Sequence, residues 1–202
     1  MKTTKNITTT TETAGIPRIP TRIKQVPPLT VDPIDETVRR EVAARLEALG
    51  EQLAGVHRIA AEAYLSQGMH EEALAHLEAA ARFAPREIEY QNQLGVVRYF
   101  QEDDAGAIAA FERVIDLAPD NHDARFNLGM VLYGTGARVE AEEAFRIALE
   151  LDPNEAETWN NRGVCLFELG RIGDARACFE RALQIDPENQ DARENLASAE
   201  GR

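Results

Sequence analysis

The sequence is poor in cysteine and has no long hydrophobic run. Cys165 and Cys178 are its only cysteines, and no CxxC spacing joins them. We therefore predict neither a disulfide framework nor a thiolate metal site, and expect both thiols to be buried, reduced packing residues. Apolar runs extend over a few residues only, which excludes a membrane span. No apolar segment comes after Met1–Lys5, so a secretory signal is not expected and the predicted location is cytoplasmic.

Basic side chains are also scarce. Lysine and arginine number 22 against 35 acidic residues, and the net charge is −13. Residues 1–34 carry five basic and two acidic side chains, whereas the remainder carries 17 basic and 33 acidic ones. A body this acidic repels phosphate backbones, so we do not expect a nucleic-acid partner. It favours a protein or peptide partner of basic or amphipathic character.

The first 32 residues are predicted to be a disordered, basic, Thr/Pro-rich tail, because proline lacks the amide donor and disfavours helix in the preceding residue. Asp32 and Pro33 suit an N-cap and a first helical position. Apolar residues then recur at helical spacing, which predicts an amphipathic N-terminal capping helix over 33–53 that covers the exposed end of the segment beginning at residue 54. They are Val38, Val42, Leu46, Leu49 and Leu53.

A repeat of 34 residues organises the rest of the chain. Prolines at that spacing mark the ends of four units, 54–87, 88–121, 122–155 and 156–189. Four positions of the unit keep one kind of residue. Position 8 is small (Ala61, Gly95, Gly129, Gly163), and position 20 is alanine (Ala73, Ala107, Ala141, Ala175). Position 24 is Leu77, Phe111, Phe145 or Phe179, and position 27 is Ala80, Val114, Ala148 or Ala182.

These residues resemble the tetratricopeptide repeat, whose pattern is W-x2-L-G-x2-Y…A-x3-F…A…P. The resemblance implies an all-α, right-handed α-solenoid of four helix-turn-helix units. Residues 190–202 begin a fifth copy and are predicted to be a C-terminal solvating helix. Several residues depart from the pattern. Glu102 replaces the turn glycine of the second unit, and Arg98 and Arg162 occupy apolar positions. Position 4, where tryptophan is expected, is His57, Gln91 and Arg125 in the first three units and Trp159 only in the fourth.

The face opposite the core stripe of each first helix lines a concave groove in proteins of this family. The predicted peptide-binding residues combine a row of carboxamides with apolar and aromatic side chains. They are Gln93, Asn127, Asn161, Asn195, Val96, Met130, Val164, Tyr99, Phe126, Tyr133 and Phe167. An acidic rim accompanies them at Glu89, Asp123, Glu157 and Asp191.

A carboxamide both donates and accepts hydrogen bonds, so a row of carboxamides can bind the main chain of an extended peptide. The row is similar to the asparagine ladder in the repeats of O-linked N-acetylglucosamine transferase. Asparagine is common at this position throughout the family, however, which leaves a purely structural reading open. Val96, Met130 and Val164 predict apolar peptide side chains as ligands, unless they pack against an adjacent repeat or the tail. The acidic rim either selects a basic ligand or is solvated surface.

The sequence predicts no enzyme, no metal site and no cofactor. Its four histidines are scattered, and no glycine-rich phosphate loop follows a strand. Co-chaperones of the family clamp a terminal carboxylate with lysine, arginine and asparagine. Of the matching positions here only Arg58 keeps the charge, whereas Glu62 and Asp123 would repel a carboxylate, so we do not expect that clamp.

Two other functions stay open beside a protein-binding scaffold or adaptor. In the first, the chain forms a homo-oligomer or closes on itself, with the basic segment Ile16–Ile23 in its acidic groove. In the second, it is the accessory subunit of an enzyme complex.

Overall fold

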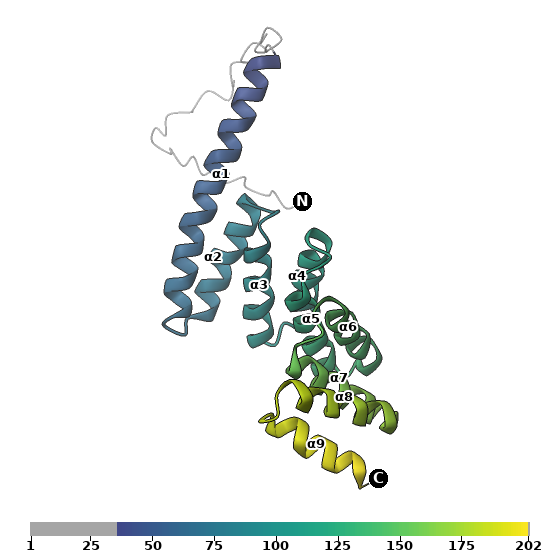
Figure 1. The fold of residues 1–202 in the computed structure, drawn as a ribbon. Coiled ribbons are helices and arrows are strands. Elements are labelled where there is room, and N and C mark those ends of the chain that lie inside the picture. The colour runs from purple at the N-terminus through teal and green to yellow at the C-terminus, as the bar shows by residue number, and fades with distance from the viewer. Residues whose placement is uncertain (1–35, 202) are drawn as a thin grey trace, which may run out of the picture. The chain divides into compact units, whose positions relative to one another are not determined.

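The computed structural model describes residues 36–201, and all regular secondary structure in that range is α-helical (Figure 1). The helices are α1 (Glu36–Leu65), α2 (His70–Phe83), α3 (Ile88–Phe100), α4 (Asp104–Leu117), α5 (His122–Thr135), α6 (Arg138–Leu151), α7 (Ala156–Glu168), α8 (Ile172–Ile185) and α9 (Gln190–Glu200). None of them has the length and apolarity that crossing a lipid bilayer requires. The predicted tail, the helix start at Asp32 and tail docking fall outside the described residues.

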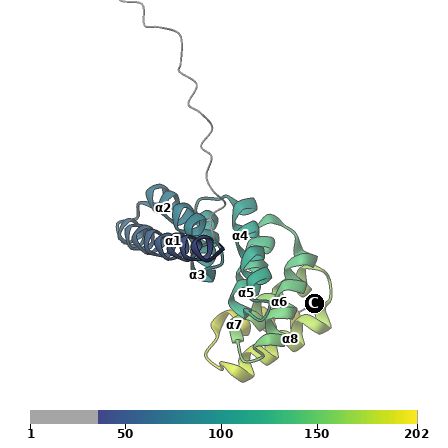
Figure 2. The same cartoon turned by 90° about the horizontal axis from the view of Figure 1, so that it is seen from above.

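The helices follow the 34-residue period. Helices α3, α5, α7 and α9 begin 34 residues apart, and α2, α4, α6 and α8 do the same. Each helix packs against its neighbours in the chain, and α9 also contacts α7 (Figures 1 and 2). The all-α repeat architecture predicted from the sequence is thereby confirmed.

Close approach of the two helices in a repeat depends on the pairing of positions 8 and 24. A Cβ atom on Gly95, Gly129 or Gly163 would lie 2.5–2.7 Å from the ring of the phenylalanine at position 24. That distance is shorter than any ordinary carbon contact, so glycine is required there. The first repeat uses Ala61 with the smaller Leu77, and both are fully buried.

Each core cluster contains residues of two successive repeat units. Phe111 of α4 packs with Val131 of α5, and Phe145 of α6 packs with Cys165 of α7. One repeat cannot bury its apolar face alone, so the repeats depend on their neighbours for stability. Cys165 and Cys178 are free and buried, as predicted, and burial raises the pKa of each thiol to about 11.

The turns inside the repeats require left-handed backbone. Gly68, Gly136 and Gly170 have φ of 73°, 90° and 78°. Glu102 occupies the equivalent position in the second repeat and adopts φ 61°, the only positive value of a non-glycine residue in the described range. The turn geometry is therefore kept at the cost of local strain.

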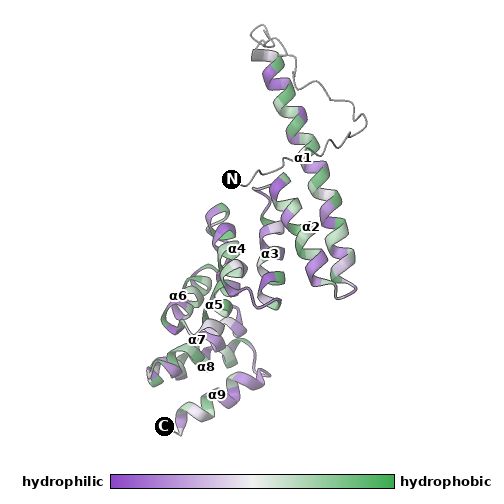
Figure 3. Cartoon of the chain, turned by 180° about the vertical axis from the view of Figure 1, so that it is seen from behind, coloured by the Kyte–Doolittle hydropathy of each residue, from purple (hydrophilic) through white to green (hydrophobic). Residues whose placement is uncertain are grey.

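Helix α1 differs from the predicted arrangement. The predicted capping helix and the first helix of the first repeat are one uninterrupted helix across residues 53 and 54. Leu46, Leu49 and Leu53 are exposed to 64%, 52% and 38%, and Val42 and Val56 are exposed as well. No described helix covers this apolar stripe, whose hydrophobic residues are visible along α1 in Figure 3.

Arg98 and Arg162, which occupy apolar positions of the repeat, are accommodated by ion pairs. Arg162 donates from Nε to Glu142 at 2.8 Å, which links α7 to α6, and both side chains are largely buried. Arg98 donates to Glu78 of α2 at 3.0 Å and to the carbonyl of Gly106. These pairs hold the guanidinium groups at the edge of the core, where their stems lie along apolar surface.

Candidate functional site

The first helices of successive repeats present the predicted carboxamides, and two hydrogen bonds connect these helices. Asn195 of α9 donates to Oδ1 of Asn160 on α7 at 2.9 Å. Asn161 of α7 donates to the sulfur of Met130 on α5 at 3.3 Å. Helices α5, α7 and α9 therefore place their inner residues side by side, and α3 contacts α5. We call the surface formed by these four first helices the inner face.

The carboxamides of the row differ in how many of their hydrogen-bonding groups are free to bind a ligand. Asn195 already uses an N–H on Asn160, whose side chain is buried, and Gln93 donates to Glu89 at 2.8 Å. Asn127 makes no side-chain hydrogen bond within the described range. The amide of Asn127 is thus the freest in the row, whereas Asn195 has a role in joining the last two first helices.

The apolar residues of the inner face are half-buried or exposed. Val96 is 39% exposed. Met130 and Val164 are partly buried and pack at the edges of two core clusters. Together with Tyr133 and Asn161 they line a small hollow of about 70 Å³. Both residues thus belong partly to the core, while their remaining surface is available to a ligand.

A larger apolar hollow lies where α1, α2 and α3 meet, and we call it the groove pocket. It measures about 290 Å³ and is lined by Leu65, His70, Glu89, Asn92, Gln93, Val96, Val97 and Phe100. Two buried acceptors at its wall, Oδ1 of Asn92 and Oε1 of Gln93, have no hydrogen-bond partner. Both oxygens are buried, so a ligand can reach them only if these side chains change their rotamers.

Sequence reasoning found only part of the groove pocket. It named Glu89, Gln93 and Val96 as binding residues but missed Leu65, His70 and Phe100. Phe100 is 69% exposed, with its ring 6.4 Å from that of His70. The available signal was Phe100 itself, an aromatic residue at the end of α3 that precedes the polar residues Gln101 to Asp104. The contribution of α1 and α2 to the pocket could not be read from the repeat pattern, which describes one repeat at a time.

The predicted aromatic residues have different environments. Tyr99 is exposed, whereas Phe126 lies 5.8 Å from Phe145 and Phe167 packs against the last core cluster. The hydroxyl of Tyr133 donates to Glu168 on α7 at 2.7 Å. Arg138 also binds Glu168, and its guanidinium lies 4.1 Å from the centre of the Tyr133 ring.

The group formed by Tyr133, Arg138 and Glu168 ties the third repeat to the fourth. The hydrogen bond to Glu168 raises the pKa of Tyr133. The same bond and the bond from Arg138 lower the pKa of the Glu168 carboxyl. Tyr133 is therefore engaged in a contact between repeats as well as being available at the inner face.

The four residues of the predicted acidic rim are all exposed. Glu89 accepts from Gln93, and Asp123 lies 3.4 Å from Nδ1 of His122. Glu157 and Asp191 border a polar hollow of about 450 Å³ that Asn160 and Asn161 also line. This end of the inner face is therefore acidic and polar, in contrast to the apolar groove pocket.

The histidines are less scattered than the sequence predicted. Nδ1 of His57 lies 2.9 Å from Nδ1 of His76, and this contact joins α1 to α2. Phe83 and Tyr64 stack on the two imidazoles. Within residues 36–201, no three histidine, cysteine or acidic side chains are grouped so that they could hold a metal ion.

Sequence comparison matches three stretches of the chain to the tetratricopeptide repeat. Models of this repeat match residues 54–79, 92–156 and 156–189, which together make up more than half of the chain. No curated protein matches the sequence significantly.

Several solved structures have a similar fold. MamA 41-end from Desulfovibrio magneticus RS-1 is 23% identical, with a TM-score of 0.71, over 74% of this chain and 85% of that one. YrrB, described as a TPR protein with an unusual peptide-binding site, is 25% identical, with a TM-score of 0.64, over 78% and 84%. The first TPR of Spaghetti, bound to an HSP90 peptide, is 21% identical, with a TM-score of 0.56, over 57% and 91%.

Proposed function

This chain belongs to the tetratricopeptide repeat family, and on that premise we propose that it is a non-catalytic adaptor that binds an extended segment of a partner polypeptide along its inner face. The groove pocket carries the proposal. It offers an apolar hollow for one side chain of the ligand, and the carboxamide side chains of Asn92 and Gln93 lie in its lining, beside the main chain of a bound peptide. An extended peptide supplies both kinds of group at once.

Charge supports a basic or amphipathic ligand. The four carboxylates of the acidic rim lie along the first helices, and Glu157 and Asp191 border the polar hollow at the far end of the inner face. A ligand with an apolar anchor in the groove pocket and basic residues toward α9 matches both features. Rim charges mainly affect association rate, so binding is expected to weaken as salt rises.

The mode of recognition differs from a terminal-carboxylate clamp. Spaghetti is seen with an HSP90 peptide that ends in aspartate. Here the one matching cation, Arg58, is paired with Glu62 on the next turn of α1. Asp123 remains exposed beside the inner face and would repel a carboxylate. We therefore place internal, uncharged or basic peptide segments, rather than acidic chain ends, on this surface.

The expected affinity is modest. Three or four amide hydrogen bonds contribute roughly 0.5–1.5 kcal/mol each. One or two buried apolar side chains add to this, and ordering the peptide opposes it. The net result corresponds to a Kd of roughly micromolar order, which suits a reversible adaptor.

The test uses peptides selected on the purified full chain from a display library of random sequences. Val96→Gln places an amide in the groove pocket and is expected to weaken binding about tenfold or more. Val139→Gln makes the same change at an exposed valine of α6, outside the inner face, and is the matched control. Affinities measured by calorimetry would refute the proposal if Val96→Gln and an Asn127→Ala/Asn161→Ala variant both bound like the unaltered chain.

A further inference from the structure

Helix α1 carries more exposed large apolar side chains than any other described helix. Five of them form the exposed stripe of α1 and follow one another at alternating spacings of four and three residues. They are Val42, Leu46, Leu49, Leu53 and Val56. This spacing is that of a seam between two paired helices. Contiguous apolar surface marks an interaction site on a soluble protein, so the stripe predicts a helical partner.

The later repeats show how the same positions are covered elsewhere in the chain. Val56 is at position 3 of the first repeat and is 64% exposed. The residues at position 3 of the following copies are buried: Tyr90, Ala124, Thr158 and Ala192. At position 10, Ala63 is exposed, whereas the following copies bury Val97, Val131, Cys165 and Ala199. Val131 and Cys165 pack against the preceding repeat, and within residues 36–201 no helix takes that place for the first repeat.

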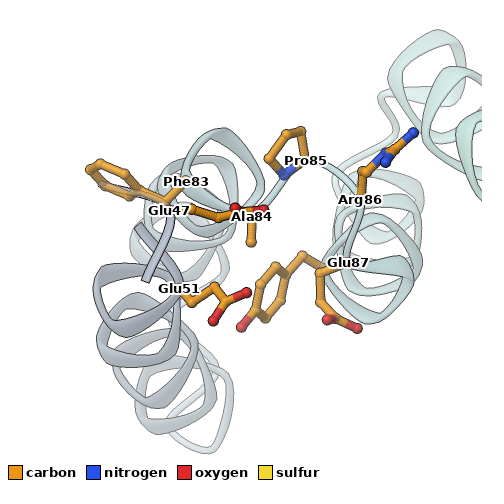
Figure 4. A pocket seen from close by; sticks show the side chains of 8 residues that line it. Glu47, Glu51, Phe83, Ala84, Pro85, Arg86 and Glu87 are labelled. Carbon is orange, nitrogen blue, oxygen red and sulfur yellow. The ribbon is translucent and has the colours of Figure 1, made fainter. Parts of the chain in front are cut away.

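Helix α1 cannot cover its own repeat. Figure 4 shows the side chain of Glu51 directed into a hollow at the end of α2. Leu53 follows Glu51 by two positions and so lies about 160° away around the helix, on the side turned from this hollow. Residues 41–49, which we call the projecting segment, are all exposed, and Figure 1 shows this end of α1 extending beyond α2. Because α1 is continuous, the projecting segment cannot fold back onto Val56.

A second copy of the chain supplies the cover that the first repeat lacks. When two α1 helices pair in antiparallel orientation, the projecting segment of each copy lies on the first repeat of the other, and one two-fold axis relates the two contacts. In one register the facing pairs are Leu49 with the partner's Leu53, Leu46 with the partner's Val56, and Val42 with the partner's Ala60. The larger side chains of the projecting segment then meet the smaller ones of the repeat, which keeps the seam evenly filled. Parallel pairing would set Ala60 against its own copy and leave a void.

The opposite end of the repeats does not match the stripe. Helix α9 closes that end, and apart from Ala197 its exposed residues are all polar. Head-to-tail association would bury these polar groups against leucine and valine, which costs free energy. Two stripes bury only apolar side chains against each other, so association closes at two copies.

The paired length suffices for a specific dimer. From Val42 to Ala60 the helix extends about 27 Å, and two helices in contact over that length bury roughly 1,000 Å² in total. This area is at the lower limit for specific association, so we expect a Kd of roughly micromolar order. No charged side chain occupies the seam, so pairing two acidic chains brings no like charges into it.

We propose that the chain forms a two-fold symmetric dimer by antiparallel pairing of α1, in which the projecting segment of each copy covers Leu53, Val56 and Ala60 of the other. The first repeat thereby gains the neighbour that every later repeat has within the chain. None of these residues lines the groove pocket, so the proposal holds whether or not the inner face binds peptides.

Sedimentation velocity of the full chain, over concentrations on both sides of the expected Kd, tests the proposal. The unaltered chain is expected to approach twice its monomer mass. Leu46→Glu replaces a side chain that is 64% exposed in one copy, sets a carboxylate against the partner's Val56 and should raise the Kd about 100-fold or more. Val139→Glu makes the matched change on α6, where the valine is 62% exposed, and should leave dimerisation intact. A monomeric unaltered chain, or a Leu46→Glu chain that dimerises like Val139→Glu, would overturn the proposal.

Disulfide formation tests the orientation of the pair. The native cysteines are buried, which leaves an introduced thiol as the reactive one. A mixture of Leu49→Cys and Leu53→Cys chains is expected to form an intermolecular disulfide under mild oxidation, because antiparallel pairing sets these two positions opposite each other. Either variant alone should cross-link more slowly, since its thiols are offset along the seam. Cross-linking of Leu49→Cys with itself as fast as in the mixture would indicate parallel helices and contradict the proposal.

Discussion

At the scale of single residues, stability depends on matched pairs between the two helices of a repeat. Gly129 leaves room for the ring of Phe145, which a Cβ atom would approach to 2.7 Å. Ala61 with Leu77 is the alternative solution that the first repeat uses. Glycine with phenylalanine and alanine with leucine fill the same space between the two helices of a repeat. Replacing one member of a pair without the other should therefore destabilise the repeat.

Gly129→Ala is expected to destabilise the chain by about 1–3 kcal/mol, because the added methyl group overpacks a closed interior. Phe145→Leu should recover part of that loss in the double variant, since it recreates the Ala/Leu pairing. Urea unfolding of both single variants and of the double variant gives the coupling energy. Purely additive effects would contradict the pairing.

Gly134→Ala in the same helix is the control for this substitution. No atom lies within 4 Å of the Cβ that would be added there. Alanine should therefore stabilise α5 by about 0.5–1 kcal/mol through its better helix propensity. The same substitution is thus expected to have opposite signs at two positions of one helix.

Glu102 offers a second prediction at this scale. A left-handed conformation costs a non-glycine residue about 1–2 kcal/mol, and Glu102 adopts one where the other repeats have glycine. Glu102→Gly should therefore stabilise the chain by up to about 1 kcal/mol after the greater freedom of glycine in the unfolded chain is subtracted. Glu102→Ala removes the charge without relieving the backbone and should bring no such gain in the midpoint of urea unfolding.

At the scale of helices, the contacts between repeats contain polar groups that the apolar pattern does not describe. Tyr133 and Arg138 of the third repeat both bind Glu168 of the fourth. These bonds lower the pKa of the Glu168 carboxyl below its usual range. Glu168 therefore binds its proton more weakly in the folded chain than in the unfolded one, so its ionised form favours folding.

The stability contributed by Glu168 should be present above the pKa of the unfolded carboxyl and lost as the pH falls through the lower, folded pKa. The side chain is 38% exposed, so solvent screening limits the effect to less than about 1 kcal/mol. The free energies of unfolding of the unaltered chain and Glu168→Gln should differ at pH 7 and converge in acid. A difference that stays constant as the pH falls would contradict this assignment.

The sequence predicted the helices better than it predicted the polar contacts between their side chains. Prolines and small residues at a 34-residue spacing set the ends and the contacts of α3 to α9, because the two helices of each unit pack against each other through the same positions. The bond from Asn195 to Asn160 and the contact of His57 with His76 have no counterpart in that pattern. They depend on which side chains meet across two helices.

Helix α1 shows a second limit of sequence reasoning. Its apolar residues Val42, Leu46 and Leu49 predicted a helix that caps the first repeat. The helix exists, but it continues straight into the repeat and leaves these residues exposed. Periodicity identifies an apolar face without identifying what covers it. Gly50 and Gly55 flank the predicted boundary, but both lie within the helix and neither has a positive φ, so no turn folds the helix back.

At the scale of the whole molecule, repetition produces a surface as well as a core. Residues that do not pack within a repeat recur on the inner side of the first helices, where they form the candidate binding face. The groove pocket and the acidic rim lie on this face, and most of the negative charge of the chain lies in the repeats and α1. A basic or amphipathic peptide is therefore expected to contact several repeats at once.

NMR titration of the isotope-enriched chain with a selected peptide tests this central claim most directly. We expect the largest chemical-shift changes in α3, α5 and α7, around Val96, Asn127 and Asn161, while signals from exposed residues of α6 and α8 such as Val139 and Arg176 stay in place. Shift changes concentrated on α6 and α8, with Val96 and Asn127 unaffected, would contradict it.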